Sequence, residues 1–135
     1  MDARSAAARW AETWVSAWRS HDVEPVVALY AEGCVHRSAP FRTPHHGRAG
    51  VREYVGGAFA DESAVVDVRF GAPAVDGDRA CVEYWATVHD RDGAPVTLAG
   101  SAFVRFDADG LITEARDYWH ETAGHVPPPE LWGQV

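Results

Sequence analysis

Three Asp-Gly pairs divide the second half of this chain into stretches of strand length. The pairs are Asp76-Gly77, Asp92-Gly93 and Asp109-Gly110, and the stretches around them are rich in β-branched and aromatic residues. Asp-Gly favours tight hairpin turns because both residues tolerate a positive φ. The pattern therefore predicts four strands joined as an antiparallel meander, at residues 65–70, 79–89, 95–106 and 111–120.

The first half of the chain has the periodicity of helices instead. Between Ala3 and Arg19, apolar residues recur at steps of three and four, which is the spacing of an amphipathic helix. Asp22 and Pro25 suit the start of a second helix, and Gly33 can end it. The sequence predicts three helices, over residues 3–19, 22–33 and 49–59, with a short strand at 34–38 and a loop at 40–47. Helices followed by hairpins indicate an α+β fold.

Composition limits the expected partners. The chain has 135 residues, the length of one domain, and a formal net charge of -8 with scattered basic residues. Nucleic acid is not an expected partner, because its binding needs a basic patch. No apolar run reaches the roughly 18 residues of a membrane span and the N-terminus lacks a signal pattern, so we expect a cytoplasmic protein. Cys34 and Cys81 fit small core residues in a reducing compartment.

The strand expected at 79–89 carries apolar residues on both faces. One face consists of Cys81, Glu83, Trp85, Thr87 and His89, and the other of Val82, Tyr84, Ala86 and Val88. A sheet covered by its own helices on one side and apolar on the other needs a second cover, and a second copy of the chain is the commonest source. The sequence therefore predicts a homodimer through the β-sheet.

Three stretches carry a resemblance to a known family: residues 20–32, the His46-Gly47-Arg48 triplet, and residues 104–110 with 117–121. In this order and spacing they resemble the SnoaL-like and ketosteroid-isomerase-like branch of the nuclear-transport-factor-2-like (NTF2-like) superfamily. The resemblance implies a cone-shaped α+β fold. Three N-terminal helices would pack on a strongly curved, mixed but mostly antiparallel β-sheet and enclose a pocket. The domain would span residues 1–121, followed by a proline-rich tail at 122–135.

The resemblance does not extend to the chemistry of ketosteroid isomerase. That enzyme uses an Asp base, with a Tyr and a protonated Asp that hold the oxyanion. An ungapped comparison places Ser38, Trp14 and Ala102 at these three positions. Steroid isomerisation by that mechanism is therefore not expected, and the fold alone does not assign another reaction.

Asp117 is the first candidate for a catalytic group. It lies in the last predicted strand, close to Trp119, and a carboxylate desolvated among aromatic residues has a raised pKa that suits proton transfer near neutral pH. SnoaL-like cyclases place their acid–base aspartate in this final strand, so the resemblance implies the same role here. The alternative is a structural ion pair with Arg105 or Arg116.

Histidines supply the second candidate. His36 would share a face of its strand with Ser38 and could act as a second acid or base, because the unperturbed pKa of histidine is close to physiological pH. His45 and His46 are adjacent, so their side chains diverge, and no third ligand with metal-site spacing is evident. We therefore expect no metal and no cofactor.

Aromatic side chains are expected to form the pocket wall. The Trp14 indole and the Tyr30 hydroxyl could donate hydrogen bonds to a flat ligand, whereas Trp10 and Trp18 are expected in the core. Glu83 would face either the pocket or a salt bridge in the dimer interface. The predicted ligand-contacting residues are Trp14, Tyr30, Ser38, Phe59, Glu83, Trp85, Thr87, His89 and Trp119.

Three functions follow from these residues. The first is a cofactor-free acid–base enzyme, isomerase-like or polyketide-cyclase-like, that acts on an apolar cyclic or carbonyl compound with Asp117 as proton carrier and His36 as its partner. The second is a non-catalytic domain that binds a small apolar or aromatic ligand in the same pocket. The third, epoxide hydrolysis, normally needs an Asp-Arg-Asp arrangement, and only Asp117 has a place in it.

Overall fold

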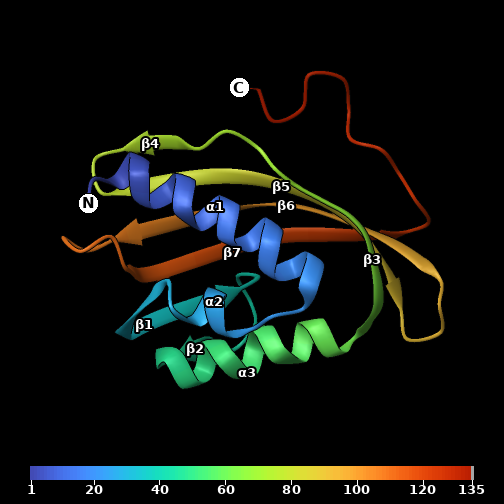
Figure 1. The fold of residues 1–135 in the computed structure, drawn as a ribbon, viewed down its shortest axis with the longest axis horizontal. Coiled ribbons are helices and arrows are strands. Elements are labelled where there is room, and N and C mark those ends of the chain that lie inside the picture. The colour runs from blue at the N-terminus through green and yellow to red at the C-terminus, as the bar shows by residue number, and fades with distance from the viewer. Residues whose placement is uncertain (135) are drawn as a thin grey trace.

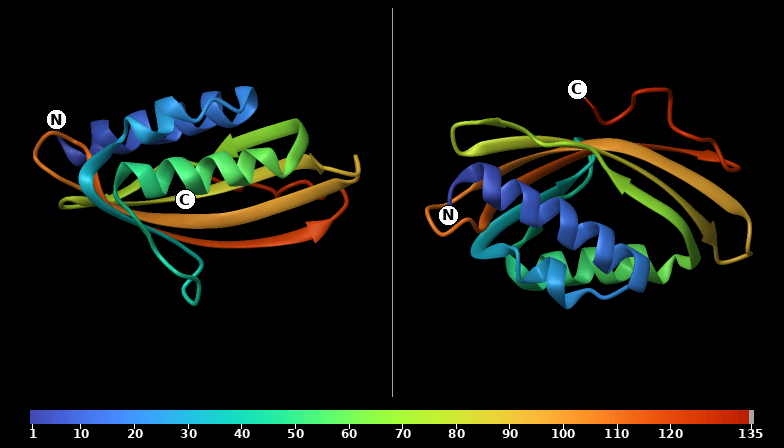
Figure 2. Two further views of the ribbon diagram at one scale, coloured as in Figure 1. Left: turned by 90° about the horizontal axis from the view of Figure 1, so that it is seen from below. Right: turned by 45° about the horizontal axis from the view of Figure 1, so that its top comes forward.

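The computed structural model describes residues 1–134, and in it the helices lie on the concave side of one curved sheet (Figures 1 and 2). In chain order the elements are α1 (Ala3–Ser20), α2 (Glu24–Val27), β1 (Tyr30–Ser38), β2 (His45–His46), α3 (Gly47–Ala60), β3 (Glu62–Phe70), β4 (Ala74–Asp76), β5 (Arg79–Asp90), β6 (Pro95–Phe106) and β7 (Ile112–Ala123). The predicted α+β class is confirmed. Val135, the last residue of the predicted tail, lies outside the described residues.

The sheet has the order β2-β1-β7-β6-β5-β3, with β4 beside β5. The pairs β3–β5, β5–β6 and β6–β7 are antiparallel, which confirms the predicted meander. The added feature is β1, which runs parallel to β7 and makes the sheet mixed. This pairing sets Ser38 opposite Asp117 and His36 opposite Ala115, so the candidate residues of β1 lie beside the last strand.

Helix α1 forms one wall of the interior. Asp2 caps its N-terminus, where the side chain accepts a hydrogen bond from the Ser5 amide at 2.8 Å, and His21 caps its C-terminus with a left-handed φ of 53°. Trp10 and Trp18 lie on its buried face, which packs against the strands. The six-residue buried stripe of α1 follows the predicted helical spacing.

Helix α2 is a single turn, shorter than the helix predicted at residues 22–33. The Ile112 amide donates to the Leu29 carbonyl at 2.8 Å, and Tyr30 pairs with Ile112, so the backbone after α2 joins the sheet. Strand β1 therefore begins at Tyr30 rather than at Cys34. Pairing with β7 overrides the local helical preference, because propensity is a weak term beside tertiary contacts.

The structure also differs from the predicted bounds of the loop and the tail. The loop at 40–47 contains the two-residue strand β2, which pairs with Val35 and His36. Strand β7 continues two residues into the predicted tail, because Thr122 and Ala123 pair with β6. Prolines exclude regular structure only after that point.

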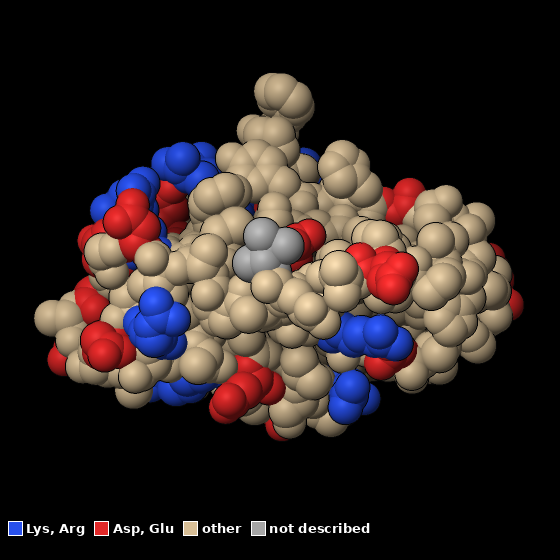
Figure 3. Space-filling view, turned by 90° about the horizontal axis from the view of Figure 1, so that it is seen from above, with Lys and Arg blue, Asp and Glu red and all other residues tan. Residues whose placement is uncertain are grey.

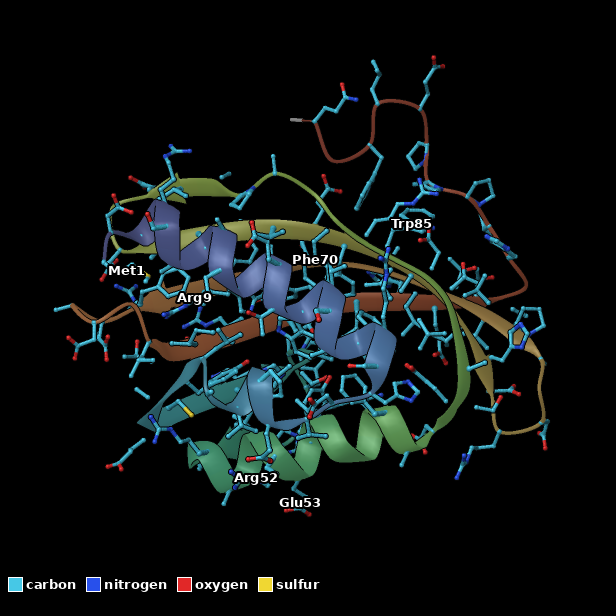
Figure 4. All side chains as sticks on the ribbon, viewed as in Figure 1. Met1, Arg9, Arg52, Glu53, Phe70 and Trp85 are labelled. Atoms are coloured by element: carbon cyan, nitrogen blue, oxygen red, sulfur yellow. The ribbon has the colours of Figure 1, made fainter. Side chains whose placement is uncertain are left out.

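The remaining tail runs back on the convex side of the sheet, opposite the helices (Figure 2, right). Figure 4 shows Trp85 close to it, and the Trp85 indole donates a hydrogen bond to the Val126 carbonyl at 2.8 Å. The rings of Trp85 and Trp132 lie 6.2 Å apart, edge to face. The Ala72 amide donates to the Gly133 carbonyl at 3.0 Å. The tail thus covers part of the apolar outer face.

Charges of both signs share the surface. On the face shown in Figure 3, acidic and basic side chains are interspersed and form no stripe of one sign. Arg79 pairs with Asp76 and Arg105 with Asp78 at one end of the sheet. None of the helices within residues 1–134 has the length and apolar character that spanning a membrane requires.

Part of the convex face stays uncovered, and we propose that a second copy of the chain packs there. Phe103 and Tyr118 are 52% and 40% exposed, and their rings touch edge to face at 6.0 Å. Phe103→Glu would place a charge in such an interface. We expect a dimer for the wild type and a monomer for this variant in light scattering. Ala8→Glu, on the exposed face of α1, should stay dimeric, and a monomeric wild type would refute the proposal.

Candidate functional site

A cavity of about 660 Å³ lies between the helices and the concave face of the sheet. One wall is a set of mutually contacting aromatic rings. Trp14 packs edge to face on Trp18 at 6.1 Å and on Phe59 at 6.2 Å, and Phe70 stacks on Tyr84 at 5.4 Å. Phe70 lies behind α1 in Figure 4. The tryptophans therefore line the cavity rather than fill it, and its volume suits a small organic molecule.

The structure brings seven of the predicted site residues to this cavity: Trp14, Tyr30, His36, Ser38, Phe59, Asp117 and Trp119. They come from α1, β1, α3 and β7, which are far apart in the sequence. Trp10 and Trp18, which we expected only in the core, also border the cavity. Parallel pairing of β1 with β7 is what unites the polar members of this set.

The other four predicted residues, Glu83, Trp85, Thr87 and His89, lie on the opposite face of β5, so their expected place in the pocket is wrong. The face with Tyr84 and Val88 borders the cavity. Thr87 is buried, but its hydroxyl lies 3.5 Å from that of Thr97 on the convex side. Both faces of β5 carry apolar residues, because one borders the cavity and the other packs against the tail. The alternation of residues along the strand therefore cannot show which face borders the cavity.

Asp117 is half-buried at the cavity wall. Its Oδ1 accepts a hydrogen bond from the Tyr84 hydroxyl at 2.7 Å, and no residue within 1–134 donates to its Oδ2. Burial raises the pKa of Asp117 to about 6, and the bond from Tyr84 acts in the opposite direction. The predicted alternative of an ion pair does not hold, because Arg105 pairs with Asp78 and Arg116 with Glu114.

Tyr84 is a site residue that sequence reasoning missed. It projects from the cavity face of β5, and its hydroxyl lies where a side chain at Gly100 would be. A Cβ on Gly100 would sit 2.8 Å from this hydroxyl and 2.5 Å from the Tyr118 carbonyl oxygen. A glycine inside a strand often marks such a close approach, so Gly100 was the available signal.

Ser38 is held on both sides. Its hydroxyl accepts a hydrogen bond from the Trp119 indole at 2.9 Å and shares another with the Tyr54 hydroxyl at 2.9 Å. Ser38 therefore positions these two rings. Burial, together with the charge of Asp117, raises the pKa of Tyr54 to about 12, so this phenol stays neutral. Tyr54, on α3, was not among the predicted site residues.

His36 is buried, with 3% of its surface exposed. Its Nδ1 lies 2.9 Å from the Tyr30 hydroxyl, and its Nε2 has no partner within residues 1–134. Burial, with a smaller contribution from His45, lowers the pKa of His36 to about 4. The imidazole is therefore neutral at neutral pH, which does not support the expected use of His36 as an acid that gives up an imidazolium proton.

Four acidic residues also line the cavity, and we call them the acidic rim: Glu53, Asp61 and Glu121, which are exposed, and Asp90, which is half-buried. Beside it, Glu62 accepts hydrogen bonds from the Trp18 indole at 3.0 Å and the His21 ring at 2.8 Å, and burial raises its pKa. Within residues 1–134, no group of three or more His, Cys, Asp or Glu side chains is arranged to hold a metal ion.

The raised pKa of Asp117 has a consequence for stability. Asp117 ionises near pH 6 in the folded chain and near pH ~4 in the unfolded chain, so its ionisation destabilises the fold progressively between these values. Asp117→Asn should raise the free energy of unfolding above pH 6 by about 3 kcal/mol, with no gain below pH 4. Urea denaturation at pH 4 and pH 8 measures this difference.

The matched control is Glu12→Gln on the exposed side of α1, which should show no such pH-dependent gain. If Asp117→Asn were less stable than the wild type at pH 8, the ionised carboxylate would be a structural stabiliser rather than a cost to the fold.

Solved structures with the same architecture are numerous. An epoxide hydrolase/cyclase-like enzyme, SalBIII, of pyran ring formation in the polyether salinomycin aligns with a TM-score of 0.76 at 19% identity, over 90% of this chain and 97% of that chain. A putative aromatic ring hydroxylase from Novosphingobium aromaticivorans aligns with a TM-score of 0.71 at 23% identity, over 90% and 93%.

A third structure, a protein with a ketosteroid isomerase-like fold from Catenulispora acidiphila in complex with trimethylamine, aligns with a TM-score of 0.69 at 20% identity, over 79% of this chain and 82% of that chain. At these identities the likeness concerns the fold alone. Among curated proteins, none matches the sequence significantly.

The family model of the SnoaL-like domain matches residues 11–115, which run from within α1 to the first residues of β7. The match stops two residues before Asp117, so it does not include the part of β7 that carries Asp117 and Trp119. The fold is the one the resemblance implied. The chain belongs to the SnoaL-like domain family of the NTF2-like superfamily.

Proposed function

We propose that this SnoaL-like domain binds a small, largely apolar carbonyl compound in its cavity and that Asp117 transfers a proton on it. The observation that carries the proposal is the state of the Asp117 carboxylate. It borders an aromatic cavity, it has no ion-pair partner within residues 1–134, and its pKa is raised to about 6. A group that titrates close to neutral pH can both accept and return a proton.

The step needs no cofactor. Asp117 takes a proton from the carbon next to the carbonyl group, and the C–H electron pair forms a carbon–carbon double bond while the carbonyl oxygen becomes negative. The protonated Asp117 can trade its proton with solvent and deliver a solvent proton to the same carbon, which gives exchange. It can also pass the proton to another carbon, which gives isomerisation. Tyr84 holds Oδ1, so Oδ2 is the oxygen left to face the ligand.

The acidic rim narrows the choice of ligand. Glu53, Asp61, Asp90 and Glu121 border the cavity, and among the lining residues within 1–134 the only Lys or Arg is Arg42. Like charges repel, so a negatively charged compound is disfavoured at this opening. The aromatic wall of Trp14, Phe59 and Phe70 favours a flat, apolar body. A neutral cyclic ketone satisfies both conditions.

Two other functions use the same cavity. A non-catalytic domain would need only the aromatic wall, so ligand binding that survives loss of Asp117 would favour it. Epoxide hydrolysis has less support because it normally needs a second aspartate at the reaction centre. Asp90, another cavity-lining aspartate, lies six residues beyond Tyr84 on β5, or about 20 Å at the rise of a strand.

Exchange of α-protons tests the proposal directly. We expect the protein to accelerate the exchange of the α-protons of 2-tetralone for deuterium in D₂O, measured by proton NMR. Asp117→Asn should lower this rate at least 100-fold, because an amide cannot accept the proton. Glu12→Gln should leave the rate unchanged. A wild type that binds the ketone without accelerating exchange would favour the non-catalytic alternative.

The pH dependence gives a second test. The rate should fall as pH drops below about 6, where Asp117 becomes protonated. Tyr84→Phe removes the hydrogen bond that favours the ionised carboxylate, so the pKa of Asp117 rises further and the fall should begin at higher pH. Circular dichroism checks that the variant is folded. An unchanged profile in Tyr84→Phe would show that Tyr84 does not tune this group.

A further inference from the structure

Three buried side-chain nitrogens within residues 1–134 have no hydrogen-bond partner: Arg9 Nε, Trp10 Nε1 and His36 Nε2. Arg9 uses its Nη2 to donate to the Gly110 carbonyl at 2.8 Å, so its head group is already engaged. Trp10 and His36 border the cavity. His36 alone of these two lies on β1, the strand that pairs with the strand of Asp117. A buried polar group without a partner is costly, and a ligand can supply the partner.

The contact with Tyr30 decides which ring nitrogen of His36 carries the proton. The Tyr30 hydroxyl is fully buried, and His36 Nδ1, at 2.9 Å, is its hydrogen-bond partner. If the hydroxyl donates to Nδ1, one group is left unpaired, the N–H of Nε2. If Nδ1 donates instead, two are left, the hydroxyl hydrogen and the Nε2 lone pair. The first arrangement leaves fewer buried groups unsatisfied.

We propose that Tyr30 holds His36 in the neutral Nε2–H tautomer and that this N–H donates a hydrogen bond to the carbonyl oxygen of the ligand. This role deepens the proposed function, on which it rests, and it makes His36 a donor rather than a second acid or base. Tyr30 is then a positioning residue. A neutral imidazole can polarise a carbonyl without giving up its proton.

The surroundings of His36 keep the ring neutral. The Tyr54 ring lies 4.6 Å from it and the His45 ring 6.4 Å, and neither offers a carboxylate that would stabilise an imidazolium. Tyr30, its hydrogen-bond partner, is buried, and this burial raises the pKa of its hydroxyl well above the usual value. The phenol therefore stays protonated and remains available as the donor to Nδ1.

The spacing between His36 and Asp117 fits a carbonyl and its neighbouring carbon. Ser38 is the residue opposite Asp117, so His36 is offset by two residues on the adjacent strand, or about 8 Å between Cα atoms. A ligand can span such a gap if its carbonyl oxygen lies about 3 Å from the His36 ring and its neighbouring carbon about 3 Å from the Asp117 carboxylate. An α-proton within reach of Asp117 then belongs to a carbonyl whose oxygen lies toward His36.

Nitrogen NMR of the imidazole tests the tautomer without any turnover. In protein labelled with ¹⁵N-histidine at pH 7, His36 should show a protonated Nε2 and an unprotonated Nδ1. Addition of 2-tetralone should shift the Nε2 resonance, whereas tetralin, the same bicycle without the oxygen, should not. The Tyr30→Phe variant should lose the fixed tautomer and show a mixture. A His36 protonated at Nδ1, or an Nε2 resonance that both probes shift alike, would overturn the proposal.

Substitution at His36 separates its role from that of Asp117. Gln can place an amide N–H near the position of Nε2, whereas Leu cannot. His36→Gln should therefore retain the binding preference for 2-tetralone over tetralin. In His36→Leu this preference should be about tenfold smaller. Equal preferences in the two variants would refute the donor role.

These outcomes are distinct from those of the exchange assay. If the wild type binds 2-tetralone through Nε2–H but exchanges no α-protons, the proposed reaction fails and the His36 donor stands. If exchange depends on Asp117 but the Nε2 resonance does not respond to the ketone, the reaction stands and the donor role fails.

Discussion

The parallel pairing of β1 with β7 is the constraint on which the rest of the molecule depends. The meander formed by β3, β5, β6 and β7 is local in sequence, and its hairpins could form without the first third of the chain. Strand β1, with the two-residue β2 at its outer edge, carries that first third into the sheet, and β1 does so in the register that sets Ser38 against Asp117. A shift by one residue would turn His36 and Ser38 away from the cavity together. The polar end of the cavity therefore exists only when this long-range pairing is correct.

Burial of polar groups beside an apolar wall has an energetic cost. The site has two such costs, and they depend on pH in opposite directions. Asp117 has a raised pKa, so the fold loses stability from it as pH rises through about 6. His36 has a lowered pKa of about 4, so the fold loses stability from it as pH falls below the ordinary histidine value of ~6.5. At neutral pH the carboxylate is charged and the imidazole is neutral. This is the pair of states that proton abstraction and hydrogen-bond donation to an oxygen require.

Periodicity and turn chemistry predicted most of the fold from the sequence. The three Asp-Gly pairs mark the hairpins, and the spacing of Trp10, Trp14 and Trp18 marks the first helix, because both signals are local. The second helix was predicted too long, since its last residues are taken into β1 by pairing with β7. A single sequence contains no local signal for a partner some eighty residues away.

Only part of the site was predicted, because here too the sequence carries only local signals. Residues on elements with one apolar face, such as Trp14 and Asp117, lie where alternation and helical spacing placed them. On β5 the prediction chose the wrong face, because the tail makes the outer face apolar as well. Trp85 and Tyr84 are neighbours in the sequence but lie on opposite faces of the sheet. Trp85 lies under the tail, and Tyr84 lies at the cavity. Only their contacts, with Val126 and Asp117, distinguish them.

Gly100 on β6 allows the contact between Tyr84 on β5 and Asp117 on β7. Tyr84 can reach Asp117 only because the strand between them lacks a side chain at this position, where a Cβ would meet both the Tyr84 hydroxyl and the backbone of β7. The Tyr84 hydroxyl fixes one oxygen of Asp117, and the protein offers no donor for the other within residues 1–134. A carboxylate that is oriented on one side and free on the other supports the proposal that Asp117 accepts a proton from a bound molecule. Oδ2 is not among the buried unpaired atoms of residues 1–134, so it is open to the cavity, whereas a structural aspartate enclosed in the core would be paired on both sides.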